Sequence, residues 1–200
     1  MQQIDRKNTA FTAVIKHDEK SITRLAKVQY NVFQMGKKAI FVLSGVFLIL
    51  LAVFGNLNLQ AAGVLAFIGC MLWWFSDFPA RITAVRMNQA IGKKYPKVEY
   101  YFYEKEVSIT DGKEWFHMPY TIVQRFFEDK EYWYLFLTTS TSYMIPKDSL
   151  KKGDAQKFTT FIENRTGLKA EKPVAVMGLS IKSIVTRIKN SRARKAKTQK

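Results

Sequence analysis

The chain has 200 residues, with 32 Lys and Arg against 16 Asp and Glu, and a formal net charge of +16. Because one long apolar segment takes up residues 39–78, the length leaves room for a single modest soluble domain. The single cysteine, Cys70, excludes an intramolecular disulfide and so a disulfide-stabilised fold. The basic charge suits an anionic membrane surface, and nucleic acid is the competing partner for the same charge.

Residues 1–38 predict an N-terminal strand followed by an amphipathic helix, both assigned to the cytoplasm. Phe11, Ala13 and Ile15 alternate with Thr12, Val14 and Lys16, and such alternation is typical of a strand. From Glu19 onwards the spacing changes to three and four, which marks one face of a helix made of Ile22, Leu25, Val28, Val32 and Met35. Periodicity does not decide whether this helix lies on the membrane surface or packs on the later domain.

Residues 39–76 contain no Lys, Arg, Asp, Glu or His, and their only polar interruption is the turn at 55–60. We therefore predict a transmembrane hairpin over 39–78 with spans at 39–55 and 61–78, each just long enough to cross the hydrocarbon. A buried two-helix core would keep a polar face, and a cleaved signal peptide would have no second span, so both are disfavoured. Ala62, Ala66 and Cys70 form a small-residue stripe for packing within the hairpin, or alternatively for a homo-oligomer.

The basic residues that flank the hairpin predict its orientation. Lys37 and Lys38 precede the first span, Arg81 and Arg86 follow the second, and the turn between the spans is uncharged. Under the positive-inside rule the chain is a multi-pass protein of the cell membrane with both termini in the cytoplasm.

After the hairpin, residues 79–95 predict a helical stalk, and residues 96–167 predict a small β domain. The strands are expected at 98–103, 106–110, 113–118, 120–128, 132–137 and 142–146, with a two-residue hairpin at Asp111-Gly112 and a tight turn at 129–131. Such an antiparallel meander bends into a sandwich or a partly open barrel. A helix over 154–166 follows, with Asp154 as its N-cap, Ala155, Phe158, Phe161 and Ile162 on one face, and Gly167 at its end.

A strand meander closed by one C-terminal helix is the plan of a pleckstrin-homology-like (PH-like) domain. Two spans, then the run PYTIVQRFFEDKEYWYLFLTTSTSYMIPKDSL, then Phe-x-x-Phe-Ile before Gly167 resemble the YcxB-like family of bacterial membrane proteins. The resemblance covers residues 10–167, and its best marker is Met144-Ile145-Pro146-Lys147. It implies a membrane α+β protein, with a PH-like cytoplasmic domain on a two-helix hairpin, and no established activity.

Residues 168–200 form a basic tail with a hinge at Lys172-Pro173 and no acidic residue after Glu171. Apolar residues at spacings of three and four predict an amphipathic helix over 174–189 that contacts the anionic inner leaflet, and a disordered tail is the alternative. Its cationic residues are Lys182, Arg187, Lys189, Arg192, Arg194, Lys195 and Lys197.

The chain contains no local pattern for catalysis, a metal or a cofactor. His17 and His117 lie outside any zinc-binding spacing, and phosphate-binding loops and hydrolase elbows are absent from the sequence. The carboxylates of the β domain lie at predicted turns, where they are ordinarily solvated. The aromatic residues of 100–143 would suit base stacking, but they are also the usual filling of a small β domain, so nucleic acid is disfavoured.

We therefore hypothesise a non-enzymatic membrane protein that presents its domain to a protein or anionic lipid partner. The candidate binding cations of the domain are Lys147, Lys151 and Lys152, together with Lys93, Lys94 and Lys97. Two alternatives are an immunity protein that occludes a toxin or a membrane-active peptide, and a nucleic-acid tether that binds through the tail.

Overall fold

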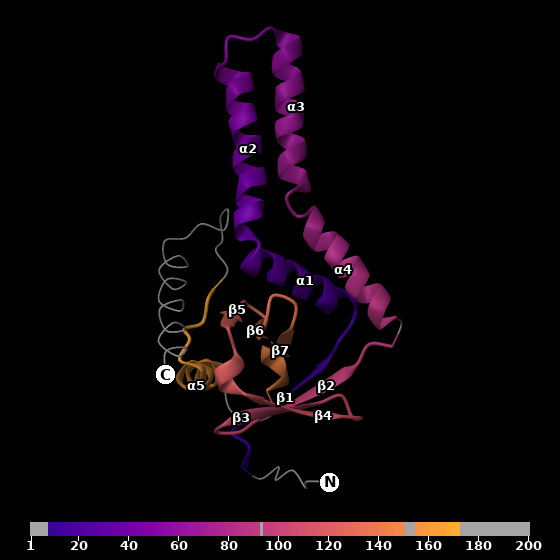
Figure 1. The fold of residues 1–200 in the computed structure, drawn as a ribbon, viewed down its shortest axis with the longest axis vertical. Helices are drawn as coiled ribbons and strands as arrows, with labels where there is room; N and C mark the ends of the chain where they lie inside the picture. The colour runs from indigo at the N-terminus through magenta and orange to yellow at the C-terminus, as the bar shows by residue number, and fades with distance from the viewer. Residues whose placement is uncertain (1–7, 93, 151–154, 173–200) are drawn as a thin grey trace. The chain divides into compact units, whose positions relative to one another are not determined.

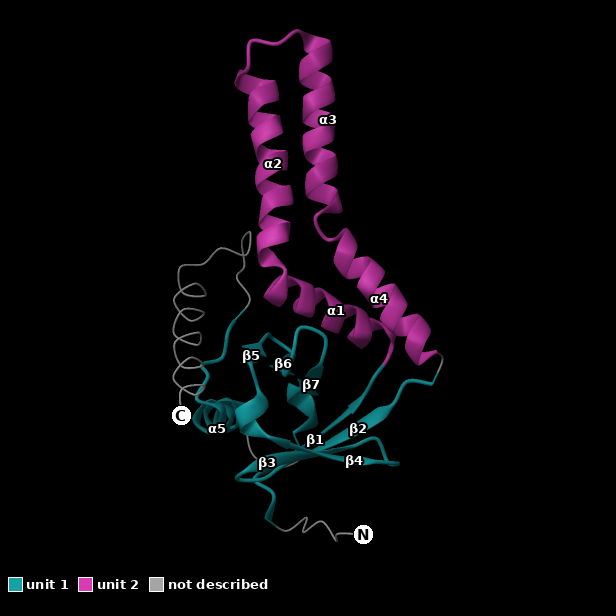
Figure 2. Cartoon of the chain, in the orientation of Figure 1, with its two compact units in different colours: residues 1–17, 94–200 teal, residues 18–93 magenta. Residues whose placement is uncertain are grey.

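The computed structural model describes residues 8–92, 94–150 and 155–172. The chain divides into two compact units (Figure 2), a β unit made of residues 1–17 and 94–200 and a helical unit made of residues 18–93. The helical unit is therefore an insertion within the β unit. The chain leaves the β unit at His17 and returns at Pro96, where the His17 N–H donates to the Pro96 carbonyl at 3.2 Å.

The helical unit contains four helices (Figure 1), which are α1 Glu19–Phe33, α2 Met35–Phe54, α3 Leu59–Phe75 and α4 Phe78–Ile91. Asp18 and Ser21 form a reciprocal capping box at the start of α1, and the Asn58 side chain accepts the Ala61 N–H at the start of α3. The helix predicted as a stalk over 79–95 ends earlier, because Gly92 takes a φ of 70° that stops it.

The two helices α2 and α3 pack through one pair of glycines. Gly45 and Gly69 are the only buried residues of these helices, and a Cβ on either would lie 2.7 Å from the other's carbonyl oxygen. The predicted stripe of Ala62, Ala66 and Cys70 is wrong at its last position, because Cys70 is exposed and the close contact runs through its neighbour. Only a residue without a Cβ permits this backbone approach.

Two helical stretches are long and apolar enough to cross a membrane, Met35–Phe54 and Leu59–Ile91, with mean hydropathies of 2.2 and 1.6. The second stretch combines α3 and α4. The helix α1, whose packing the sequence left open, lies against α4 within the same unit. Ala80 and Ala84 of α4 are buried.

The β unit contains seven strands in two antiparallel sheets. One sheet has the order β1-β2-β3-β4 and the other β5-β6-β7, and their bounds are β1 Phe11–Lys16, β2 Lys97–Phe102, β3 Glu106–Thr110, β4 Trp115–Pro119, β5 Arg125–Glu128, β6 Tyr132–Phe136 and β7 Ser142–Pro146. The N-terminal strand β1 pairs along its whole length with β2, from Phe11↔Phe102 to Lys16↔Lys97. The six strands expected after residue 96 are therefore confirmed, whereas the expectation that the β domain begins at 96 is wrong because it left out β1.

Two local predictions in the β unit are also wrong, and one is confirmed. Thr110 pairs with Trp115, so the β3–β4 loop has four residues, because the Asp111 carboxylate accepts the N–H groups of Lys113 and Glu114. The segment predicted as one strand over 120–128 begins instead with a short 3-10 helix, Tyr120–Ile122. The turn at 129–131 is confirmed, since Asp129 accepts the Glu131 and Tyr132 N–H groups.

The core of the β unit is aromatic and is closed by α5, Ala155–Thr166. Phe158 of α5 packs on Phe102 and Trp133, at ring centroid distances of 4.8 and 4.5 Å, and Ile162 is fully buried. Of the predicted apolar face, Ala155 is exposed, because the first turn of the helix extends beyond this core. Gly167, with a φ of 68°, ends the helix as predicted, and Asp154 lies outside the described residues.

The chain remains part of the fold beyond the predicted end of the domain at 167. Leu168 is buried, and the Glu171 backbone joins the edge of β5 by donating to the Phe126 carbonyl at 2.9 Å and accepting the Glu128 N–H at 2.8 Å. The Glu171 carboxylate forms a buried ion pair with both Nε and Nη2 of Arg125. Residues 168–171 therefore extend the second sheet instead of starting a free tail.

Candidate functional site

A polar cluster joins the two ends of the helical hairpin. Lys38 Nζ lies 2.6 Å from the Asp77 carboxylate and 3.1 Å from the Asn31 side-chain oxygen, and the Tyr30 hydroxyl donates to the Ser76 carbonyl at 3.0 Å. We call these five residues the hairpin-base cluster. It ties the α1–α2 junction to the α3–α4 junction, so it fixes the directions in which α1 and α4 leave the hairpin.

Asp77 is the centre of this cluster, and the sequence analysis missed it. It is the only acidic residue between positions 20 and 98, and a second lysine, Lys27, lies 3.9 Å from its other oxygen. Burial raises the pKa of the Tyr30 hydroxyl, and the negative charge of Asp77 raises it further. A lone carboxylate directly after an uncharged span was the signal that could have revealed the cluster.

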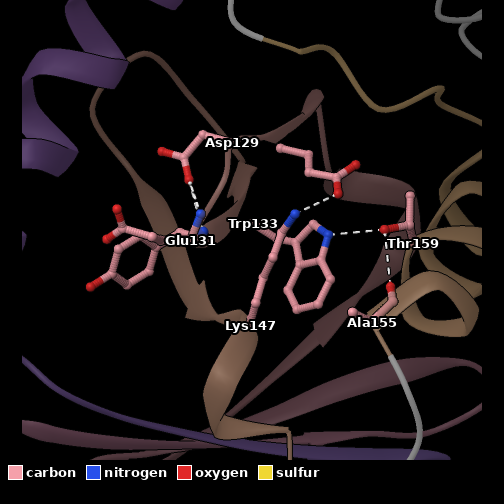
Figure 3. Close-up of polar contacts among 8 residues, drawn as sticks. Asp129, Glu131, Trp133, Lys147, Ala155 and Thr159 are labelled. Atoms are coloured by element: carbon pink, nitrogen blue, oxygen red, sulfur yellow. Dashed lines mark hydrogen bonds and ion pairs between the residues drawn. The ribbon is translucent and has the colours of Figure 1, made fainter.

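Lys147 is one of the predicted binding cations, and the structure shows that its side chain interacts with other residues of the fold (Figure 3). Its Nζ lies 2.6 Å from Glu128 Oε1 and 5.1 Å from the centroid of the Trp133 ring, and its side chain is 23 % exposed. The Trp133 indole N–H in turn donates to Thr159 Oγ1 at 3.0 Å. This geometry suits a link between β5, β6 and α5.

Of the other predicted cations, Lys94 and Lys97 are the two that the structure describes. Lys97 pairs with Glu99 at 2.8 Å on the surface of β2, and Lys94 is exposed. The remaining candidates lie outside the described residues, namely Lys93, Lys151, Lys152, Lys182, Arg187, Lys189, Arg192, Arg194, Lys195 and Lys197.

Charge is nearly balanced over the described part of the β unit, which contains 12 Lys and Arg against 11 Asp and Glu. The described part of the helical unit has seven against three, and residues 173–200 have eight basic residues and no acidic one. The excess charge of the chain therefore lies mainly outside the strands.

Exposed aromatic side chains lie along β4, the edge strand of the first sheet. Trp115 and Phe116 are 42 % and 49 % exposed, and nearby Ile122 is 42 % exposed. Trp115 packs on Tyr101 at 5.6 Å between ring centroids. An edge strand with large apolar side chains is suited to pairing with a strand from another chain.

His117 lies on the same strand, and its geometry does not form a catalytic triad. The same ring nitrogen, Nδ1, lies 2.9 Å from Ser108 Oγ and 3.2 Å from Glu106 Oε1. In a triad the carboxylate and the nucleophile contact opposite nitrogens of the ring. Within the described ranges, no group of three His, Cys, Asp or Glu residues is placed to hold a metal ion.

The fold defines an α+β protein whose antiparallel sheets carry an apolar helical hairpin inserted after the first strand. Residues 102–162 match the family model described as YcxB-like protein, in agreement with the resemblance that the sequence indicated. The match spans β3 to β7 and most of α5, and it excludes β1, the helical unit and Glu171. Neither the curated proteins nor the solved structures gave a match to the chain.

Proposed function

We propose that this chain is a non-enzymatic integral membrane protein whose hairpin holds a cytoplasmic PH-like domain beside the membrane, where the domain binds a protein partner. The observation that carries the proposal is the exposure of apolar side chains along α2 and α3. Phe54, Leu59 and Trp74 are 80 %, 90 % and 72 % exposed. The core helix of a soluble protein would bury such residues, whereas lipid is the solvent that accepts them.

The PH-like part of the proposal is supported by the arrangement of the β unit. Four strands form one sheet, three form the other, and a single C-terminal helix packs its Phe158 into the core between them. In this proposal the hairpin occupies the first inter-strand loop, between β1 and β2. Lys37, Lys38, Arg81 and Arg86 flank the spans and support a cytoplasmic location of both chain ends.

A protein partner is favoured over an anionic lipid for the β unit. Its described residues carry nearly equal numbers of basic and acidic side chains, and Lys147 is already paired with Glu128. The edge strand β4, with exposed Trp115 and Phe116 on opposite faces of the sheet, offers instead an edge to which an extended peptide can add a strand. Binding of an anionic lipid by the domain remains the alternative.

The test has two parts. Topology is measured with an impermeant thiol reagent on cells that carry a single cysteine in the C70A background. Asn58→Cys, between the spans, is expected to react from outside, and Lys94→Cys only after the cells are opened.

Partner binding is then measured with a photo-crosslinking amino acid at position 116 in the full-length protein, with position 157 on α5 as the matched exposed control. Capture of a defined protein at 116 alone is expected. The domain would be reassigned to lipid binding if lipid alone crosslinked at 116.

A further inference from the structure

The helix α4 has two unlike faces. Ala80 and Ala84, spaced by four, are buried in the helical unit, where α4 packs on α1. On the opposite side Phe78, Ile82 and Val85 are 47 %, 37 % and 54 % exposed. Spacings of four and three place these three side chains on one stripe of the helix.

Cations border this apolar stripe on both sides. At 3.6 residues per turn, Arg81 lies on one flank of the Phe78–Ile82–Val85 stripe and Arg86 on the other, and both are exposed. No acidic residue occurs between Phe78 and Ile91. An apolar stripe between two arginines is the pattern of a helix that lies in the membrane interface, with its apolar face among the acyl chains and its cations at the phosphates.

The stripe begins where the apolar surface of the hairpin ends. The rings of Phe75, the last residue of α3, and Phe78, the first of α4, are 5.5 Å apart. The chain bends between α3 and α4 (Figure 1), and the two linking residues, Ser76 and Asp77, both belong to the hairpin-base cluster. The exposed surface of α4 is therefore continuous with the one that the proposed function assigns to lipid.

We infer that α4 is an interfacial helix, in which Phe78, Ile82 and Val85 enter the anionic leaflet and Arg81 and Arg86 bind lipid phosphates. This inference rests on the proposed membrane location of the hairpin. It gives the helix that the sequence predicted as a stalk the role of a second attachment to the membrane, and Asp77 and Lys38 set the angle of that helix to the spans.

The test uses the full-length C70A protein in vesicles of phosphatidylethanolamine and phosphatidylglycerol, with a single nitroxide label. The label is placed at Val85→Cys, at Ala90→Cys as a control that is exposed away from the stripe, or at Leu50→Cys within α2. Collision with oxygen reports lipid, and collision with a soluble nickel chelate reports water. The label at 85 is expected to favour oxygen, and the label at 90 is expected to favour nickel.

The arginines are tested in the same assay with Arg81→Gln and Arg86→Gln. Each substitution is expected to lower the ratio of lipid-docked to undocked label at position 85 about fivefold, because a basic residue near an anionic surface contributes about 1 kcal/mol. Replacing phosphatidylglycerol with phosphatidylcholine is expected to have a similar effect. If neither change affects the label, the assignment of lipid phosphates to these arginines is overturned.

Three further outcomes of the labelling experiment would overturn the interfacial assignment of α4. A label at 85 in water with the label at 50 in lipid overturns the interfacial helix and leaves the hairpin in the membrane. Labels at 50 and 85 both in water overturn the proposed function itself. Spin–spin broadening at 85 that disappears on dilution with unlabelled protein shows that a second copy covers the stripe, which also overturns the inference.

Discussion

Glu171 lies beyond both the family match and the sequence-predicted end of the domain, yet its side chain forms a buried ion pair. We predict that Glu171→Gln destabilises the β unit strongly. The Arg125 side chain is only 10 % exposed, so the substitution leaves a guanidinium charge without its carboxylate. Removal of one partner of a buried pair costs about 3–5 kcal/mol, and glutamine, which keeps the volume and an acceptor, is expected near the lower end.

This loss can be measured by urea unfolding of the full chain in detergent micelles. Trp133 is fully buried, so its fluorescence reports on the β unit when the other three tryptophans are replaced by Phe. With a slope of about 1.5 kcal/mol per molar urea, a loss of about 3 kcal/mol lowers the unfolding midpoint by about 2 M. Lys172→Gln, one residue along and exposed, is the matched control and is expected to change stability by less than about 0.5 kcal/mol.

The double variant Arg125→Met, Glu171→Leu removes both charges and keeps apolar side chains of similar volume. It therefore distinguishes the cost of an unpaired buried charge from the cost of losing the 168–171 segment from the sheet. Replacement of a buried ion pair by apolar residues of similar volume is often neutral, so most of the lost stability should return. If Glu171→Gln shifted the midpoint no more than Lys172→Gln does, residues 168–171 would not be a stable part of the sheet in solution.

Three further predictions concern packing and ionisation. Gly69→Val should destabilise the hairpin by about 1–3 kcal/mol because its side chain meets a backbone carbonyl, whereas Gly63→Ala, where a Cβ meets nothing within 4 Å, should leave the thermal midpoint unchanged or raised. Asp77→Asn should lower the pKa of Tyr30 while burial keeps it above the ordinary value, and absorbance titration against a Tyr30→Phe control measures this. Backbone N–H groups lower the pKa of Asp111, so its stabilisation of the β3–β4 loop should be complete above the ordinary Asp pKa and lost as pH falls through the lowered value. Carboxyl chemical shifts report this loss, and a midpoint at the ordinary value would contradict it.

The features that were predictable from sequence are those determined by residues close together in the chain. An uncharged run with a polar centre specifies a hairpin, and the Asp129 turn is specified by a side chain that bonds to its own backbone. The pairing of β1 with β2 was not predictable, because it joins Phe11 to Phe102 across an insertion that local periodicity cannot bridge. The same holds for the two glycines of the hairpin, since many small residues compete for that role until the helices are placed.

The candidate site was less predictable than the fold, for a related reason. A count of lysines treats every cation as available, whereas Lys147 and Lys38 are held by carboxylates far away in sequence. Because basic residues outnumber acidic ones in this chain, the sequence directs attention to the cations. Asp77 is therefore not identified from the sequence, although it pairs with the basic residues around it. Binding sites that depend on which charge remains unpaired require the three-dimensional structure.

The insertion point also bears on how the two units depend on each other. Insertions are best tolerated where the two chain ends lie close together, and here His17 and Pro96 are hydrogen-bonded to each other at the end of a paired ladder. Antiparallel neighbours of this kind are ordinarily joined by a two-residue turn, so the strands themselves do not require the helical unit to complete their sheet. The excess positive charge lies largely in the helical unit and in residues 173–200, while the described β unit is almost neutral. In the proposed function, attachment to the membrane and choice of partner are therefore carried by different parts of the chain, and each can change without loss of the other.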